Sequence, residues 1–69
     1  MKLGNTIRRC RFEKNETSQI ELADAIGVTR QTIFSIEKGK FVPSALLALK
    51  IARFFNKSFE EVFFIIDDE

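Results

Sequence analysis

The strongest constraint on the fold is a series of helix start and stop signals near the middle of the chain. Ser18 and Glu21 have the spacing of a capping box, so we expect Ser18 to cap a short helix that ends at Gly27. Glycine suits a sharp turn because it adopts a positive φ without a steric penalty from Cβ. Thr29 can then cap the next helix, which Gly39 would end. Two short helices joined by such a turn predict a helix-turn-helix.

The apolar residues of these two segments recur at helical spacing, which gives each helix one buried face. The expected buried residues are Leu22, Ala23, Ile26, Ile33 and Ile36. With that face turned inward, Arg30 and Gln31 lie on the outer N-terminal part of the second helix. An α-helix fits the major groove of DNA, where Arg suits guanine and Gln suits adenine. The segment 29–38 is therefore predicted to be a recognition helix, the alternative being an ordinary solvated face.

The N-terminal part of the chain has a similar helical pattern. Leu3, Ile7 and Cys10 recur at helical spacing among several arginines, so residues 3–14 are predicted to form an amphipathic helix. Only one cysteine and no histidine are present, which argues against a disulfide, a metal site or a cofactor. No nucleophile–base pair or phosphate-binding loop indicates an enzyme.

The C-terminal part is expected to contain two further helices. Ser44 would cap a helix over 45–55, and Ser58 would cap a short last helix. The helix over 45–55 would bury some of its apolar residues Leu46, Leu49, Ala52 and Phe55. Residues 63–66, of sequence FFII, are too few for a helix and rich in strand formers, so they predict an edge strand or an oligomer contact.

Length and charge bound the function further. At 69 residues the chain is expected to be one domain, 1–69. The net charge is only +1, but three of the ten acidic residues are the last three, so the preceding residues carry eleven positive and seven negative charges. This excess gives a weak indication of a polyanionic partner. Without a long apolar run or a signal-peptide pattern, we expect a soluble cytoplasmic protein and no membrane contact.

The central motifs resemble a known family of regulators. The similarity runs from about residue 7 to 63 and rests on Gln19, Leu22-Ala23, Gly27-Val28, Arg30-Gln31-Thr32-Ile33, Ile36-Glu37, Gly39-Lys40, Pro43-Ser44 and Ala52. The chain resembles the helix-turn-helix domain of the Cro/repressor, or xenobiotic-response-element, regulators. This resemblance implies an all-α, lambda-repressor-like fold of five short helices in which the third helix reads double-stranded DNA. It also implies a homodimeric transcription regulator that needs no cofactor.

The resemblance further implies roles for individual residues. Gln19 would touch a phosphate and brace Gln31, and Arg11 would form a partly buried salt bridge with Glu37. Phe34 has two interpretations, contact with a thymine methyl group or packing against its own helix. Taken together, the positions predicted to contact DNA are Gln19, Thr29, Arg30, Gln31, Thr32, Phe34, Ser35, Lys38 and Lys40. Of these, the base-facing positions are Arg30, Gln31 and Ser35.

A dimer is predicted because one recognition helix reads too few base pairs to select a site in a genome, whereas a two-fold pair matches a palindromic operator. The apolar surplus for pairing lies in the C-terminal third, with residues 58–69 contributing and Leu46 at the edge. The expected interface residues are Phe54, Phe59, Phe63, Phe64, Ile65 and Ile66. The predicted function is a repressor without an evident small-molecule effector. The alternative is an antitoxin-type regulator that also binds a second protein.

Overall fold

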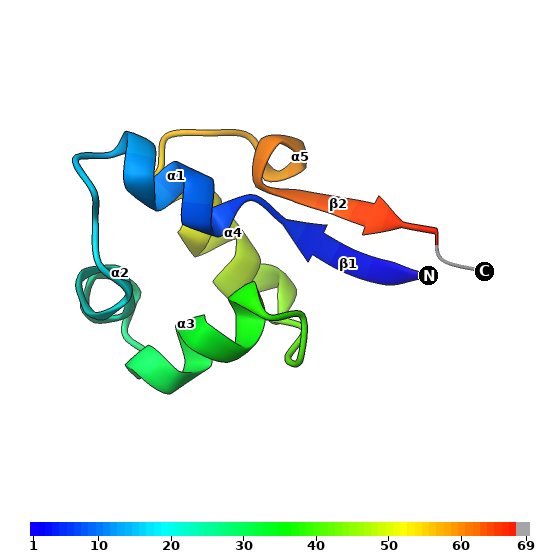
Figure 1. Cartoon of the computed structure of the whole chain (residues 1–69), viewed down its shortest axis with the longest axis horizontal. Helices are drawn as coiled ribbons and strands as arrows, with labels where there is room; N and C mark the ends of the chain where they lie inside the picture. Colours follow the sequence, from blue (N-terminus) through cyan, green and yellow to red (C-terminus); the bar gives the residue numbers. More distant parts are fainter. Residues whose placement is uncertain (68–69) are drawn as a thin grey trace.

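The computed structural model describes residues 1–67; Asp68 and Glu69, at the end of the predicted 58–69 dimerisation segment, lie outside the described residues. Five helices form the body, and two short strands form a ribbon that extends from one end of it (Figure 1). The predicted fold of five short helices is therefore confirmed, with a small antiparallel sheet added. In chain order the elements are β1 (Lys2–Asn5), α1 (Ile7–Glu13), α2 (Gln19–Ile26), α3 (Arg30–Glu37), α4 (Ala45–Phe54), α5 (Phe59–Val62) and β2 (Phe63–Ile66).

The helix-turn-helix forms from the local signals in the sequence. The Ser18 hydroxyl accepts a hydrogen bond from the Glu21 N–H at 3.0 Å, and the Glu21 carboxylate accepts one from the Ser18 N–H at 2.7 Å. Gly27 ends α2 in the left-handed conformation, with φ of 81°. The Thr29 hydroxyl accepts the Thr32 N–H and starts α3 one residue later. These contacts confirm the capping box, the turn and the second cap.

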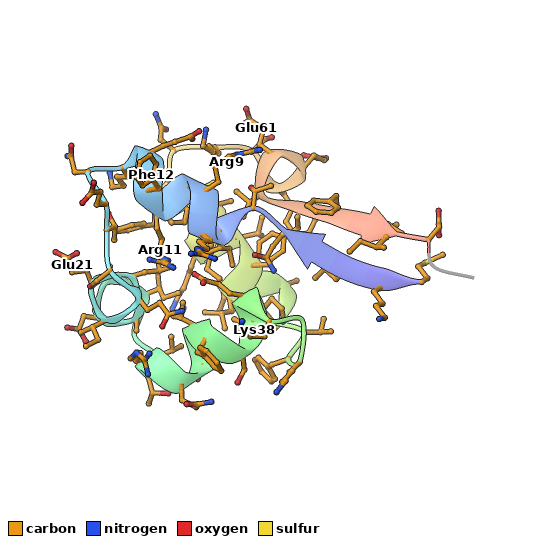
Figure 2. The ribbon with its side chains drawn as sticks, viewed as in Figure 1. Arg9, Arg11, Phe12, Glu21, Lys38 and Glu61 are labelled. Carbon is orange, nitrogen blue, oxygen red and sulfur yellow. The ribbon has the colours of Figure 1, made fainter. Side chains whose placement is uncertain are left out.

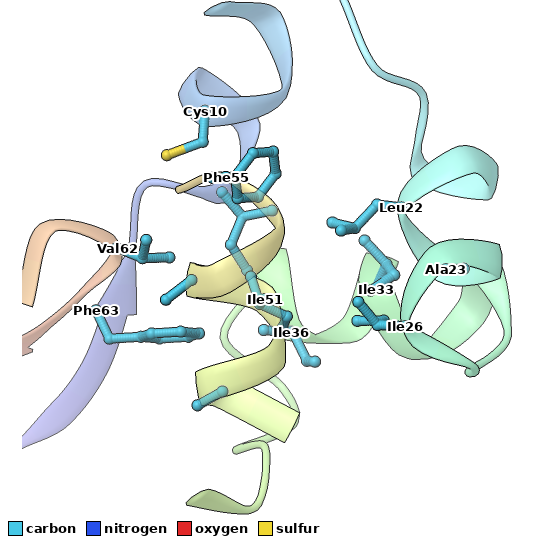
Figure 3. Packing of buried hydrophobic residues seen from close by; sticks show 13 residues of the cluster. Cys10, Leu22, Ala23, Ile26, Ile33, Ile36, Ile51, Phe55, Val62 and Phe63 are labelled. Atoms are coloured by element: carbon cyan, nitrogen blue, oxygen red, sulfur yellow. The ribbon is translucent and has the colours of Figure 1, made fainter. Parts of the chain in front are cut away.

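The inward faces of α2 and α3 meet one apolar core that all five helices share. In Figure 3, Ile51 of α4 lies at the centre, between Leu22 and Ile33 on one side and Val62 and Phe63 on the other. Four of these side chains are fully buried, and Phe63 is 2% exposed. Burying one large apolar side chain stabilises a fold by about 1.5–3 kcal/mol, so this core holds the two helices of the motif together. The predicted buried faces of α2 and α3 are confirmed at Leu22, Ala23, Ile26, Ile33 and Ile36.

The N-terminal strand β1 corrects the predicted start of the first helix at residue 3. Residues 2–5 pair with β2 in antiparallel register, Lys2 opposite Ile66 and Asn5 opposite Phe63. The Asn5 side-chain oxygen then accepts the N–H of Ile7, where α1 begins. The backbone of β1 thus finds its hydrogen-bond partners in β2, and apolar spacing alone could not distinguish that pairing from a helical turn. The strand predicted as one of two alternatives for residues 63–66 is confirmed.

The two faces of the ribbon differ because side chains alternate along a strand. On one face a Cβ added to buried Gly4 would meet the Phe64 ring at 2.5 Å, so the glycine lets this ring lie against the backbone. On the other face, Phe63 stacks on Phe59 with ring centroids 5.3 Å apart. Phe63 is therefore core, and the prediction that it supplies free surface for a dimer is wrong. Phe54 is half-buried, with its edge against Phe55, which also places its ring within the monomer.

The buried face of α4 also differs from the predicted one. Ala52 and Phe55 are buried as expected, but Leu46 and Leu49 are 66% and 54% exposed. Ala48 and Ile51 take the inward positions instead. The sequence ALLALKIA is apolar around nearly the whole helix, so periodicity permits more than one buried stripe. Packing against α2 and α5 selects the stripe with the small alanines, and leaves two leucines in solvent.

The last helix is capped as α2 is. The Ser58 hydroxyl accepts the Glu61 N–H at 3.2 Å, and the Glu61 carboxylate accepts the Ser58 N–H at 2.7 Å. The backbone hydrogen bond from Ser58, followed by the one from its hydroxyl, lowers the pKa of Glu61 below its usual range. This cap orients α5, which leads directly into β2.

Candidate nucleic-acid interface

The outer face of α3 presents the polar residues that the sequence places on a recognition helix. Arg30 and Gln31 are exposed in its first turn, while Ile33 and Ile36 face the core. The Gln31 amide donates a hydrogen bond to the Ser35 hydroxyl at 3.4 Å, one turn further along. An amide has both a donor and an acceptor, which is the pair that the N7 and N6 of adenine require. The predicted bounds and orientation of this helix are confirmed.

Phe34 lies against two cations of its own helix. The Arg30 guanidinium is 5.9 Å from the centroid of the ring, and the Lys38 ammonium is 5.7 Å from it. The three residues are four apart in sequence, so they follow one side of α3. Of the two interpretations of Phe34, these contacts favour packing against its own helix.

A polar network behind α3 fixes the helix to α1. The Arg11 guanidinium donates to both Glu37 oxygens, from Nε at 2.7 Å and from Nη2 at 3.1 Å. The two side chains are only 16% and 9% exposed, which confirms the predicted shielded pair. Arg11 also donates to the Thr17 carbonyl oxygen at 3.0 Å. In Figure 2, Arg11 lies between α1 and the motif helices, so this pair sets the distance of α3 from α1.

Gln19 joins the same network from the start of α2. Its amide donates to Glu37 Oε1 at 3.1 Å. The resemblance implied that Gln19 braces Gln31, and the structure corrects this: Gln19 braces Glu37, and Gln31 instead pairs with Ser35. The Glu37 carboxylate thus receives hydrogen bonds from two other elements, α1 and α2.

The remaining predicted contact residues flank the recognition helix. Thr29 and Thr32 share a hydrogen bond of 3.1 Å between their hydroxyls in the first turn of α3. Lys40 is exposed in the loop after α3, where its N–H donates to the Ser35 carbonyl oxygen. Lys38 caps the C-terminal end of the helix (Figure 2). Together with Gln19 at the start of α2, these residues surround the outer face of α3.

A hollow lies between α1 and α3, and it includes a residue that the sequence did not single out. That residue is Arg8, on the exposed side of α1. Three arginines stand within four positions of α1, so charge alone could not show which of them faces the motif. The hollow is lined by Arg8, Arg11, Gln19, Arg30, Phe34, Glu37 and Lys38.

Two other kinds of feature are absent from the part of the chain that the structure describes. Among residues 1–67, no group of three histidine, cysteine, aspartate or glutamate residues is placed to hold a metal ion. None of the described helices has the length and apolar character to cross a membrane.

Comparisons with known proteins agree with this geometry. The family model described as helix-turn-helix matches residues 7–62. An uncharacterised HTH-type transcriptional regulator of Methanocaldococcus jannaschii is 54% identical over 67 residues, which cover 97% of this chain and all of the relative. A Bacillus subtilis regulator of the same description is 51% identical over 51 residues, or 74% of this chain and 77% of its own length.

A third relative, from Archaeoglobus fulgidus, is also an HTH-type transcriptional regulator. It is 56% identical over 52 residues, which cover 75% of this chain and 73% of the relative. The family match includes all of α1 to α5. The chain therefore belongs to the Cro/C1-type helix-turn-helix family, whose members are DNA-binding transcriptional regulators and not enzymes.

Proposed function

We propose that this regulator is a homodimeric repressor that recognises a palindromic operator, with α3 of each protomer in the major groove. The observation that carries the proposal is the exposed Gln31–Ser35 pair on α3, held outward by the buried Ile33 and Ile36. An adenine contact by Gln31 would supply sequence preference, since bidentate contacts to base edges discriminate between base pairs. The described residues form a DNA-binding domain and a ribbon. A DNA-binding domain acts on transcription most directly by occupying a promoter.

A second copy of this chain is the partner that best suits an apolar surface beside the C-terminal end of α3. Ile65 of the ribbon lines a hollow together with Phe41 and Val42 of the following loop. These three side chains are 61%, 47% and 67% exposed, and Leu46 at the start of α4 is 66% exposed. We name this surface, formed by Phe41, Val42 and Ile65, the loop–ribbon patch. It keeps Ile65 from the sequence prediction and adds two loop residues.

The position of the loop–ribbon patch suits a two-fold axis. Because the patch adjoins the end of α3, pairing through it would leave the two α3 N-termini pointing away from the axis. Two half-sites one DNA turn apart require a separation of about 34 Å between the recognition helices. Pairing would also remove apolar surface from water, and a core of this size gains from such added burial.

Selection of bound sites from a random duplex pool tests the recognition mode, and sedimentation tests the oligomeric state. We expect selected sequences with two inverted half-sites about 10 base pairs apart, bound by a dimer. A single unrepeated motif bound by a monomer would contradict the homodimer and the palindrome. Placing the recovered operator ahead of a reporter then tests the sign of regulation, which we expect to be repression.

The antitoxin-type alternative is favoured by one observation on the ribbon. Phe64 and Ile66 lie on the face opposite Ile65 and are 43% and 42% exposed. Pairing through the loop–ribbon patch would leave this second face in solvent, where it could receive a different protein. Stable co-purification of one specific protein with the wild-type dimer, lost when Phe64 is changed to Ser, would support this alternative.

A further inference from the structure

We propose that the hollow between α1 and α3 binds a phosphodiester group of the DNA backbone. Arg8, Arg30 and Lys38 would supply its positive charge, and Phe34 would position two of these cations. The inference rests on the proposed placement of α3 in the major groove. The sequence already predicts that Arg30, Phe34 and Lys38 contact DNA, and the inference adds Arg8 as a phosphate ligand and Phe34 as the residue that positions the other two side chains. The inference also assigns Arg30 to a phosphate contact, whereas the resemblance implied a base contact.

The charges of the hollow are unbalanced. Glu37 is the one carboxylate among its lining residues, and Arg11 and Gln19 already hold both of its oxygens. None of the ion pairs found in the described part of the chain includes Arg8, Arg30 or Lys38. Three cations therefore face a shared hollow whose only carboxylate is already neutralised. Such a surface attracts an anion.

Phe34 restricts where two of the cations can go. The Arg30 and Lys38 groups lie 5.9 and 5.7 Å from the centre of its ring, within the range of cation–π attraction. A long side chain loses rotamer freedom when it binds a ligand, and prior contact with a ring reduces this loss. Phe34 is thus a positioning residue, which acts on DNA through Arg30 and Lys38.

The location of the hollow selects the DNA backbone as the source of the anion. It lies beside the outer face of α3 and is bordered by α1 and by Gln19 at the start of α2. When a recognition helix enters the major groove, the elements next to it meet the sugar–phosphate strands that border the groove. Guanidinium groups suit this ligand because their planar N–H donors match phosphate oxygens in pairs.

The salt dependence of binding to a short random duplex tests the site, because it counts neutralised phosphates. We expect Arg8→Gln and Lys38→Gln each to lower the slope of log K against log salt by about 0.9 per protomer. The matched control is Arg53→Gln, an exposed arginine that lines a separate hollow beside Asp24 and Gly27. We expect it to leave the slope at the wild-type value.

The positioning role of Phe34 is tested by variants that keep Arg30 and Lys38 unchanged. We expect Phe34→Leu to weaken binding to random duplex several-fold, and Phe34→Tyr to restore wild-type affinity because the ring is retained. Equal affinity of both variants and the wild type would overturn the positioning role. Slopes for Arg8→Gln and Lys38→Gln that match the Arg53→Gln slope would overturn the phosphate site, even if the wild type bound DNA. A wild type that bound no duplex would overturn both the site and the proposed function.

Discussion

The helix-turn-helix with the residues that hold it, here called the motif half, differs from the two-stranded ribbon, here called the ribbon half. The difference lies in how completely a single chain covers the side chains of each half. Around α2 and α3, the mostly shielded carboxylate of Glu37 is held by Arg11 and Gln19. The inward apolar side chains of the two helices lie in the core, and Ile20 of α2 is exposed. In the ribbon, Phe64, Ile65 and Ile66 remain 43%, 61% and 42% exposed. The DNA-facing half therefore needs no second chain for its own structure, whereas the ribbon carries apolar surface that association would cover.

Because of this difference, substitutions in the two halves should affect two different properties. A change in the motif half should alter the stability of a single chain, since its contacts are internal. A change on the exposed side of the ribbon should alter association and leave the folded monomer almost unaffected. Substitutions in each half can therefore be compared by two measurements, unfolding and dimer dissociation.

The largest effect is expected at the centre of the motif half. Glu37→Ala leaves Arg11 without its carboxylate in a place where both side chains are mostly shielded, and we expect a loss of about 3–5 kcal/mol in the free energy of unfolding. Urea denaturation measures it. Glu13→Ala is the control, because the Glu13–Arg9 pair is 52% and 68% exposed and should contribute less than about 1 kcal/mol. Equal losses in the two variants would show that the Arg11–Glu37 pair has no special role.

The ribbon half should respond in association. We expect Ile65→Asp to weaken the dimer by about 2–4 kcal/mol, because pairing would bury an unpaired carboxylate at a central contact. Sedimentation equilibrium measures this change, and urea denaturation of the dissociated protein should show little loss. Phe12→Asp is the control, since Phe12 is 68% exposed on α1, outside the loop–ribbon patch. A dimer weakened equally by both variants would place the interface elsewhere.

A smaller effect should separate base reading from backbone contact within the motif half. We expect Gln31→Ala to lose about 1–3 kcal/mol of preference at one position of each half-site. Lys40→Ala should instead weaken specific and random sequences alike, and lower the salt slope by about one. Competition binding with operator and random duplexes measures both. If Gln31→Ala weakened the two duplexes equally, Gln31 would not be a base-reading residue.

The smallest effect concerns the cap that joins α5 to the ribbon. Hydrogen bonds from Ser58 lower the pKa of Glu61 in the folded chain below its unfolded value. The ionised carboxylate therefore stabilises the fold above the unfolded pKa, and this contribution is lost as the pH falls through the folded value. We expect the melting temperature of the wild type to fall more than that of Glu61→Gln between about pH 6 and pH 3. Glu60→Gln is the control, because Glu60 lies outside the capping box and its substitution leaves the Ser58–Glu61 hydrogen bonds in place.

The sequence predicted the motif half well because its signals are local. The caps at Ser18 and Thr29 and the turn at Gly27 each depend on a few neighbouring residues, and all three appear in the structure. The first strand was missed because its partner, residues 63–66, lies at the other end of the chain. The phase of α4 was missed in part because Leu46 and Ala48 are both apolar, and only tertiary packing decides which is buried.

The candidate site was predictable to a similar degree. The Arg11–Glu37 pair came from the family resemblance and was confirmed at 2.7 Å. The position of Arg8 beside α3 could not be predicted, because it depends on the angle at which α1 packs on the motif. The contact of Phe34 with two cations could not be predicted for a related reason. A helical residue at this position can face either DNA or its own helix.

The pairing of β1 with β2 also determines the order in which the molecule can fold. Lys2 pairs with Ile66, so the ribbon closes almost the largest loop available in the chain. Closing a large loop costs more entropy than forming neighbouring contacts, and contacts distant in sequence form slowly. We expect α1 to α4 to fold first, and the ribbon to close only after β2 has been synthesised. Part of the surface for association would then appear last, so a growing chain would complete its DNA-facing half before it could pair with another copy.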